Sequence, residues 1–236
     1  HHIIVFVRPP NSARGSDTDV RAMRLLSGYA PGTRPFPFEP GMAKMIPAGS
    51  KLVFQMHYTP NGKPQKDRSS VGFAYIKPEE VTHWIGTTNA SNHTFRIPPG
   101  ADNHPVIADK TMEDDVLLVA LFPHMHLRGK AFRYEARYPD GRSEILLDVP
   151  KYDFNWQYNF VLAEPKLLPK GTELHCEARF DNSEANLANP DPKSEVVWGD
   201  QTWEEMMIGW YDIALPIEKV RAAESTVDKS EPNSGS

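Results

Sequence analysis

Short runs in which apolar and polar residues alternate occupy much of this chain. In the clearest run, Phe132, Tyr134 and Ala136 alternate with Arg133 and Glu135, and a Pro-Asp-Gly sequence follows at 139–141 before a second apolar run at 145–147. An apolar residue at every second position is typical of a strand with one buried face. Pro-Asp-Gly favours a tight turn. Residues 131–147 are therefore predicted to form a β-hairpin with one wet face.

The same alternation predicts further strands, while helical periodicity is rare. One short segment, 17–26, is the best helical candidate. Twenty-two prolines and fifteen glycines separate the short runs, as in β-sandwiches and barrels. The fold class is predicted to be all-β, with strands at 3–7, 51–58, 70–76, 116–122 and 207–215.

A polar stretch between residues 83 and 99 interrupts the strand pattern, and we place a domain boundary near residue 92. Two tandem antiparallel β-sandwich domains, jelly-roll-like, are expected at 1–92 and 93–216. From 217 to 236 the chain is charged and then rich in Ser, Asn, Pro and Gly. Such a composition predicts a disordered tail.

Charge and hydropathy exclude two classes of partner. The net charge is −5, and no cluster of Lys and Arg is interleaved with aromatic residues, so nucleic acid is not an expected partner. No apolar run approaches the length of a membrane span. A chain that opens on His1 without an initiator methionine is expected to have lost upstream sequence, and any export signal with it.

A single cysteine, Cys176, rules out an internal disulfide framework. In the segment 174–180, Cys176 shares the apolar side with Leu174, Ala178 and Phe180, which predicts a buried core thiol. His175 falls on the opposite side, between two glutamates. That position predicts a solvated histidine rather than a metal ligand.

The strongest candidate for chemistry is the triplet His124, Met125 and His126. It follows the apolar run 116–122 and precedes Arg128-Gly129-Lys130, so it is expected where a strand ends and a turn begins. Alternation would point the two imidazoles to one side, where they can share a metal ion. Two histidines that line a polar cavity without metal are the simpler interpretation.

Three histidines near the start of the chain suggest a second site. His1 and His2 lead the apolar run 3–7, and His57 ends the run 51–57. Neighbours in a regular strand face opposite sides, so His1 and His2 can converge only at a strand end or bulge. A residual purification tag and an ordinary surface histidine are the plain alternatives. Together the three imidazoles form a nitrogen set suited to copper.

A methionine pair, Met206 and Met207, follows Glu204 and Glu205. Alternation puts the two sulfurs on opposite faces, so that one fills the core while the other is offered to a metal. A thioether beside imidazoles favours copper over zinc, calcium or magnesium, because the sulfur is soft. Met206 is the preferred ligand, and a slip of one residue to Met207 stays open. No metal role is assigned to His83, His93 or His104.

With these motifs in order, the chain resembles the copper type II, ascorbate-dependent monooxygenases, the family of peptidylglycine alpha-hydroxylating and dopamine beta-monooxygenases. The ordered set spans residues 1 to about 215. It consists of His1-His2, His57-Tyr58, Ile97-Pro98-Pro99-Gly100, His124-Met125-His126 and Glu204-Glu205-Met206.

The resemblance implies two copper ions and a monooxygenase activity. His1, His2 and His57 match the electron-transfer copper site, and His124, His126 and Met206 match the oxygen-activating site. The implied reaction hydroxylates a C–H bond of a small organic substrate, with O2 and with electrons from ascorbate or another one-electron reductant. A secreted or periplasmic location is implied as well.

The chain departs from the family pattern at positions that hold a substrate carboxylate in the peptide-hydroxylating members. Phe122, Ile208 and Trp210 stand there, so a peptide C-terminus is a poor expectation. The main rival is a non-catalytic copper-binding or electron-transfer module with the same two sites. A third interpretation takes His1 as a true N-terminus that chelates copper, as in lytic polysaccharide monooxygenases. A zinc hydrolase is less expected, because this chain has no glutamate at a spacing typical of a general base beside paired histidines.

Overall fold

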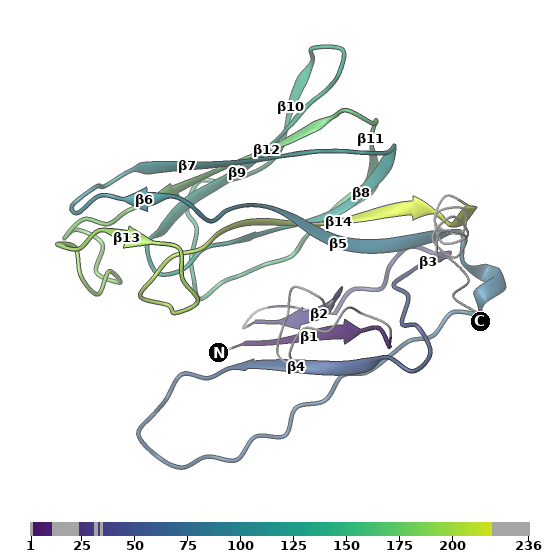
Figure 1. Cartoon of the computed structure of the whole chain (residues 1–236), viewed down its shortest axis with the longest axis horizontal. Helices are drawn as coiled ribbons and strands as arrows, with labels where there is room; N and C mark the ends of the chain where they lie inside the picture. Colours follow the sequence, from purple (N-terminus) through teal and green to yellow (C-terminus); the bar gives the residue numbers. More distant parts are fainter. Residues whose placement is uncertain (1, 11–23, 31–32, 34, 219–236) are drawn as a thin grey trace, which may run out of the picture. The chain divides into compact units, whose positions relative to one another are not determined.

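The computed structural model describes residues 2–10, 24–30, 33 and 35–218 (Figure 1). Strands dominate this part of the chain, accompanied by the short 3-10 helix η2 (Pro78–Glu80). The predicted all-β class is confirmed. The chain divides into two compact units, and each is described by itself.

The first unit comprises His1–Tyr29, Pro35–Gly86 and Ala214–Ser236. Its described strands include a three-stranded antiparallel sheet in the order β2 (Arg24–Tyr29), β1 (His2–Arg8), β4 (Lys51–His57). Strand β1 lies at the centre because its residues 5–7 are apolar and buried. The register pairs His2 with His57 at one end and Arg8 with Lys51 at the other.

The second unit comprises Ala30–Arg34 and Thr87–Ile213 and contains a β-sandwich. One layer has the order β10 (Ser143–Val149), β9 (Gly129–Arg137), β12 (Glu173–Phe180), β7 (His104–Thr111). The facing layer has the order β11 (Phe160–Leu168), β8 (Val116–His124), β14 (Met207–Pro216), β5 (His83–Asn92), β3 (Met42–Ala43). Strand β3 and the ends of β5 and β14 belong to the first unit. A small sheet pairs β13 (Val196–Val197) with β6 (Arg96–Ile97).

The core of the sandwich lies between these two layers. Phe132 and Tyr134 on β9 and Cys176 on β12 are at most 1% exposed. They approach Gly209 of β14 so closely that a Cβ there would lie 2.7 Å from the Cys176 sulfur and 3.0 Å from the Tyr134 ring. The Tyr134 hydroxyl also donates a hydrogen bond to the Trp210 carbonyl, at 3.0 Å. Glycine at 209 therefore allows the two layers to pack at this point.

Several predicted strands and the predicted hairpin are confirmed, and others are corrected. Strands β1, β4, β8, β9, β10 and β14 lie where the alternation places them, whereas 70–76 is not strand. The polar stretch after residue 83 is strand β5, which spans the division of the units between Gly86 and Thr87. Of the helical candidate, 17–23 lies outside the described residues and 24–26 opens β2. The predicted tail lies outside them from residue 219 onward.

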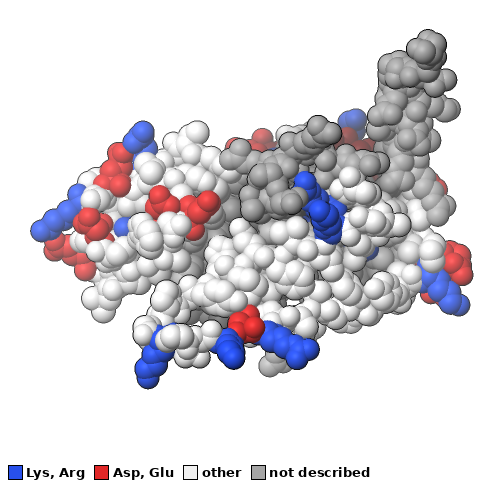
Figure 2. All heavy atoms as spheres, turned by 60° about the horizontal axis from the view of Figure 1, so that its bottom comes forward, with Lys and Arg blue, Asp and Glu red and all other residues white. Residues whose placement is uncertain are grey.

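Charged side chains are dispersed on the face drawn in Figure 2, where Lys and Arg lie among Asp and Glu without a continuous basic patch. In the part of the chain that the structure describes, no helix is long and apolar enough to cross a membrane.

Candidate metal centre

The His124-Met125-His126 triplet lies where the chain passes from one layer of the sandwich to the other. His124 is the last residue of β8, in one layer, and β9 of the other layer begins at Gly129. The two rings therefore belong to a strand end and to the loop after it, at residues 124–128. This position agrees with the predicted strand end, although alternation along a regular strand does not extend to His126.

The two imidazole rings lie close enough to share an ion. Their centres are 5.3 Å apart and their planes are nearly perpendicular, at 86°. Two imidazoles that bind one ion at about 2.0 Å have ring centres about 5 Å apart in a tetrahedral arrangement. The observed spacing fits such an arrangement.

Hydrogen bonds select the same tautomer in both rings. Nδ1 of His126 faces the Glu204 carbonyl at 3.3 Å, and a carbonyl only accepts, so this nitrogen carries the proton. Nδ1 of His124 lies 2.7 Å from Oε1 of Gln157, whose amide nitrogen donates to the Phe154 carbonyl. In the neutral rings Nε2 is then the unprotonated nitrogen, with the lone pair that metals take up. Metal-binding histidines commonly have such a partner on the other nitrogen.

A buried carboxylate holds the backbone of the 124–128 loop. Oε2 of Glu205 accepts the His126 N–H at 2.8 Å, and Oε1 accepts the Arg128 N–H at 2.6 Å. Burial raises the pKa of Glu205 to about 8, while these two N–H groups and the Arg128 charge oppose that rise. Both oxygens accept, which is the arrangement that the ionised form prefers. Glu205 thereby fixes the position of the loop that carries His126.

Arg128 is itself 2% exposed, and its guanidinium makes two hydrogen bonds. Its Nε donates to Oδ1 of Asn182 at 2.9 Å, and its Nη1 donates to the Trp203 carbonyl at 2.8 Å. Burial lowers the pKa of Arg128, and Glu205 counteracts this by its charge. The buried guanidinium ties the loop to the segment just ahead of β14.

Tyr152 and Gly129 complete the support of this loop. The Tyr152 hydroxyl accepts the Met125 N–H at 3.1 Å and donates to the Met125 carbonyl at 2.8 Å. At Gly129 a Cβ would lie 2.8 Å from Cβ of Met125 and 2.8 Å from the Tyr152 ring. The close approach of Tyr152 to the loop thus requires glycine at 129.

The two methionines after Glu205 have different surroundings. Met207 opens β14 and is 0% exposed, so it is a core residue. Met206 is half-buried and directly follows the carboxylate that bonds to the 124–128 loop. The structure therefore brings residues 204 and 205 to His126, and it leaves Met206 as the less buried of the two thioethers.

The predicted site in the first unit has a different geometry. His2 and His57 are partners across β1 and β4, and their rings stack with centres 4.0 Å apart and planes 20° apart. The lone pairs of stacked rings lie in nearly parallel planes, so one ion cannot lie in the plane of both rings. A shared ion would therefore require one ring to turn about χ2, a soft torsion. His1 lies outside the described residues.

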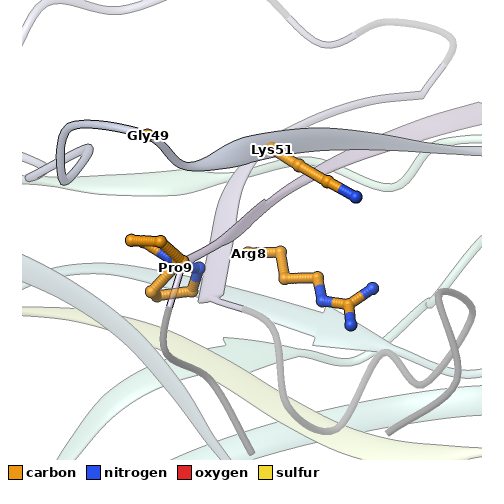
Figure 3. Close-up of a pocket in the computed structure, with 5 residues that line it drawn as sticks. Arg8, Pro9, Gly49 and Lys51 are labelled. Carbon is orange, nitrogen blue, oxygen red and sulfur yellow. The ribbon is translucent and has the colours of Figure 1, made fainter. Parts of the chain in front are cut away.

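Two features were not anticipated from the sequence. His175, predicted to be solvated, is only 9% exposed and bonds to Asp109; that prediction is wrong, because strand pairing places this residue between Asp109 of β7 and Glu135 of β9. A cavity of about 230 Å³ in the first unit is lined by Arg8, Pro9, Pro10, Gly49 and Lys51. Figure 3 shows the cationic ends of Arg8 and Lys51 extending the same way from paired strands. None of the predicted metal ligands lines this cavity.

No protein-family model and no curated protein sequence matches this chain. Among solved structures, it shows a distant likeness to the VP2 subviral particle of infectious bursal disease virus, at 8% identity and a TM-score of 0.28 over 70% of this chain and 42% of that one. A structure of the Gx strain of that virus gives 7% identity and a TM-score of 0.28 over 91% and 52%. The chain spans about half the length of these structures or less.

Proposed function

We propose that this chain is a copper-dependent monooxygenase that hydroxylates a C–H bond of a small organic substrate with O2 and a one-electron reductant such as ascorbate. The observation that carries the proposal is the pair of rings at His124 and His126, 5.3 Å apart, each with Nδ1 hydrogen-bonded. The order of motifs shared with the copper type II monooxygenases adds to it.

In this proposal, His124, His126 and Met206 would hold one copper ion. His1, His2 and His57 hold the second ion. When bound, copper would supply one-electron redox chemistry with O2. The Met206 thioether favours Cu(I), because sulfur is a soft donor.

The surrounding side chains keep the His124/His126 site in position. Gln157 and the Glu204 carbonyl set the ring orientations, and Glu205 holds the backbone at residues 126 and 128. The Phe154 ring meets the His126 ring edge to face, with centres 6.1 Å apart. An apolar ring beside His126 limits the access of water to that side.

The proposal is tested by O2 uptake. Copper-loaded protein supplied with ascorbate and a panel of small C–H substrates is expected to consume O2 in a copper-dependent way. His126→Ala should abolish the uptake. His93→Ala removes an imidazole that stacks on Trp198 and has no proposed metal role, so it should retain uptake.

Two results would contradict the proposal. Copper-loaded wild type that consumes no O2 with ascorbate and any substrate of the panel would point to a non-catalytic copper protein. Uptake that survives in His126→Ala at the wild-type rate would separate the activity from this site.

A further inference from the structure

A second group of metal-ligating side chains lies on the outer face of the β10-β9-β12-β7 layer, away from the His124/His126 loop. Asp109 of β7 and Glu173 and His175 of β12 each offer one ligand atom, and these atoms lie within 4.8 Å of one another. His175 and Asp109 are direct cross-strand partners, and Glu173 shares their face two residues along β12. The cluster is therefore built by strand register rather than by flexible loops.

The imidazole of the cluster is already held in place. Its Nδ1 lies 2.6 Å from Oδ1 of Asp109, and the ring is nine-tenths buried although it lies on the solvent side of the sheet. The side chains of Asp109 and Glu173 are 45% and 38% exposed. A buried nitrogen donor is thus flanked by two carboxylates that an ion can reach from solvent.

Acidic side chains gather around His175 on this face of the layer. Glu135 of β9 is the other cross-strand partner of His175, so three carboxylates surround the ring: Asp109, Glu135 and Glu173. Arg137 pairs with two of them, at 3.1 Å from Glu173 and 3.3 Å from Glu135, and the charge of Arg133 also acts on Glu135. The paired cations therefore lie on the Glu135 side of the ring, whereas Asp109 contacts His175 from the other neighbouring strand.

We propose that Asp109, Glu173 and His175 form a binding site for a divalent first-row metal ion such as Zn²⁺, distinct from the proposed copper sites. Imidazole and carboxylate are common zinc ligands at about 2.0–2.2 Å, and three protein ligands leave a position for water. Donors that share such an ion lie about 3–4 Å apart. The exposed carboxylates reach that spacing by a change of rotamer. This ligand set contains no thioether, in contrast to the proposed copper site that includes Met206.

Zinc binding to the whole chain tests this site, with the metal counted by mass spectrometry and titrated by calorimetry. Asp109→Asn and Glu173→Gln should each remove one zinc equivalent, or weaken its binding at least about tenfold. Glu177→Gln changes a carboxylate on the same face that pairs with Arg179, and it should bind like wild type. Arg137→Gln should bind zinc more tightly, because the competing guanidinium is gone.

The outcomes separate this site from the copper sites. His126→Ala should keep the zinc equivalent that Asp109→Asn loses, and Asp109→Asn should keep the copper signals of wild type. Circular dichroism and a melting curve check that each variant is folded. Equal zinc stoichiometry and affinity in wild type, Asp109→Asn and Glu173→Gln would overturn the proposal.

Discussion

At the scale of single residues, Gly129 limits what the 124–128 loop tolerates. A Cβ at this position would lie 2.8 Å from Met125 and from the Tyr152 ring. We expect Gly129→Ala to lower the free energy of unfolding by about 1–3 kcal/mol, as overpacking does, and to weaken copper binding at the His124/His126 site. Denaturant titration and copper titration measure the two effects.

Gly86→Ala is the matched control, because nothing lies within 4 Å of a Cβ at 86. It should change the free energy of unfolding far less than Gly129→Ala does. Equal losses in the two variants would show that the contact with Tyr152 is not the cause.

Cys176 illustrates how burial controls reactivity. Burial raises the pKa of this thiol, and the thiolate is the reactive form. The native protein at pH 8 should therefore react very slowly with a disulfide reagent such as DTNB, whereas protein in guanidinium should release one thiol per chain. Rapid labelling of the native state would contradict the core position of Cys176.

The burial of single residues could be predicted from the sequence only in part. The apolar side of 174–180 correctly predicts that Cys176 is buried. The burial of His175 was not predictable, because its partner Asp109 lies 66 residues away and meets it only through the pairing of β7 with β12.

At the scale of elements, the segment before β14 is attached to the loop after β8 through Glu205. In Glu205→Gln, the amide nitrogen would face a backbone N–H that now donates to an oxygen. Leaving one buried donor unsatisfied costs about 1–3 kcal/mol. We expect that loss in denaturant titration, together with weaker copper binding at the His124/His126 site.

Glu195→Gln is a suitable control, since Glu195 is exposed and its carboxylate forms a surface ion pair with Arg96. Exposed ion pairs contribute about 0–1 kcal/mol. If Glu205→Gln matches this control in both stability and copper affinity, the carboxylate does not hold the loop.

The elements themselves differ in how well sequence predicts them. Strands β8 and β9 follow clear apolar patterns, and both were predicted. Strand β5 was missed because polar residues such as Thr87 and Asn89 occupy it. The Thr87 hydroxyl donates to the Asp212 carboxylate of β14, so a polar residue is accommodated inside the sheet. Segment 70–76 alternates but pairs with no described strand, which shows that alternation alone does not place a strand.

At the scale of the whole molecule, each unit contributes one of the two candidate copper sites. The His2/His57 pair belongs to the first unit, and the His124/His126 pair belongs to the second. The sequence grouped His1 and His2 with His57, and His124 with His126. The β1–β4 pairing brings His2 beside His57, and the β8–β9 loop brings His124 beside His126. Ring orientation was not predictable, because it depends on Gln157 and on the Glu204 carbonyl.

Copper stoichiometry with EPR spectra tests the central claim most directly. The account predicts two copper ions per chain in wild type, with one Cu(II) signal lost in His57→Ala and the other lost in His126→Ala. Bound zinc in place of copper, or a single copper signal that neither variant changes, would contradict it.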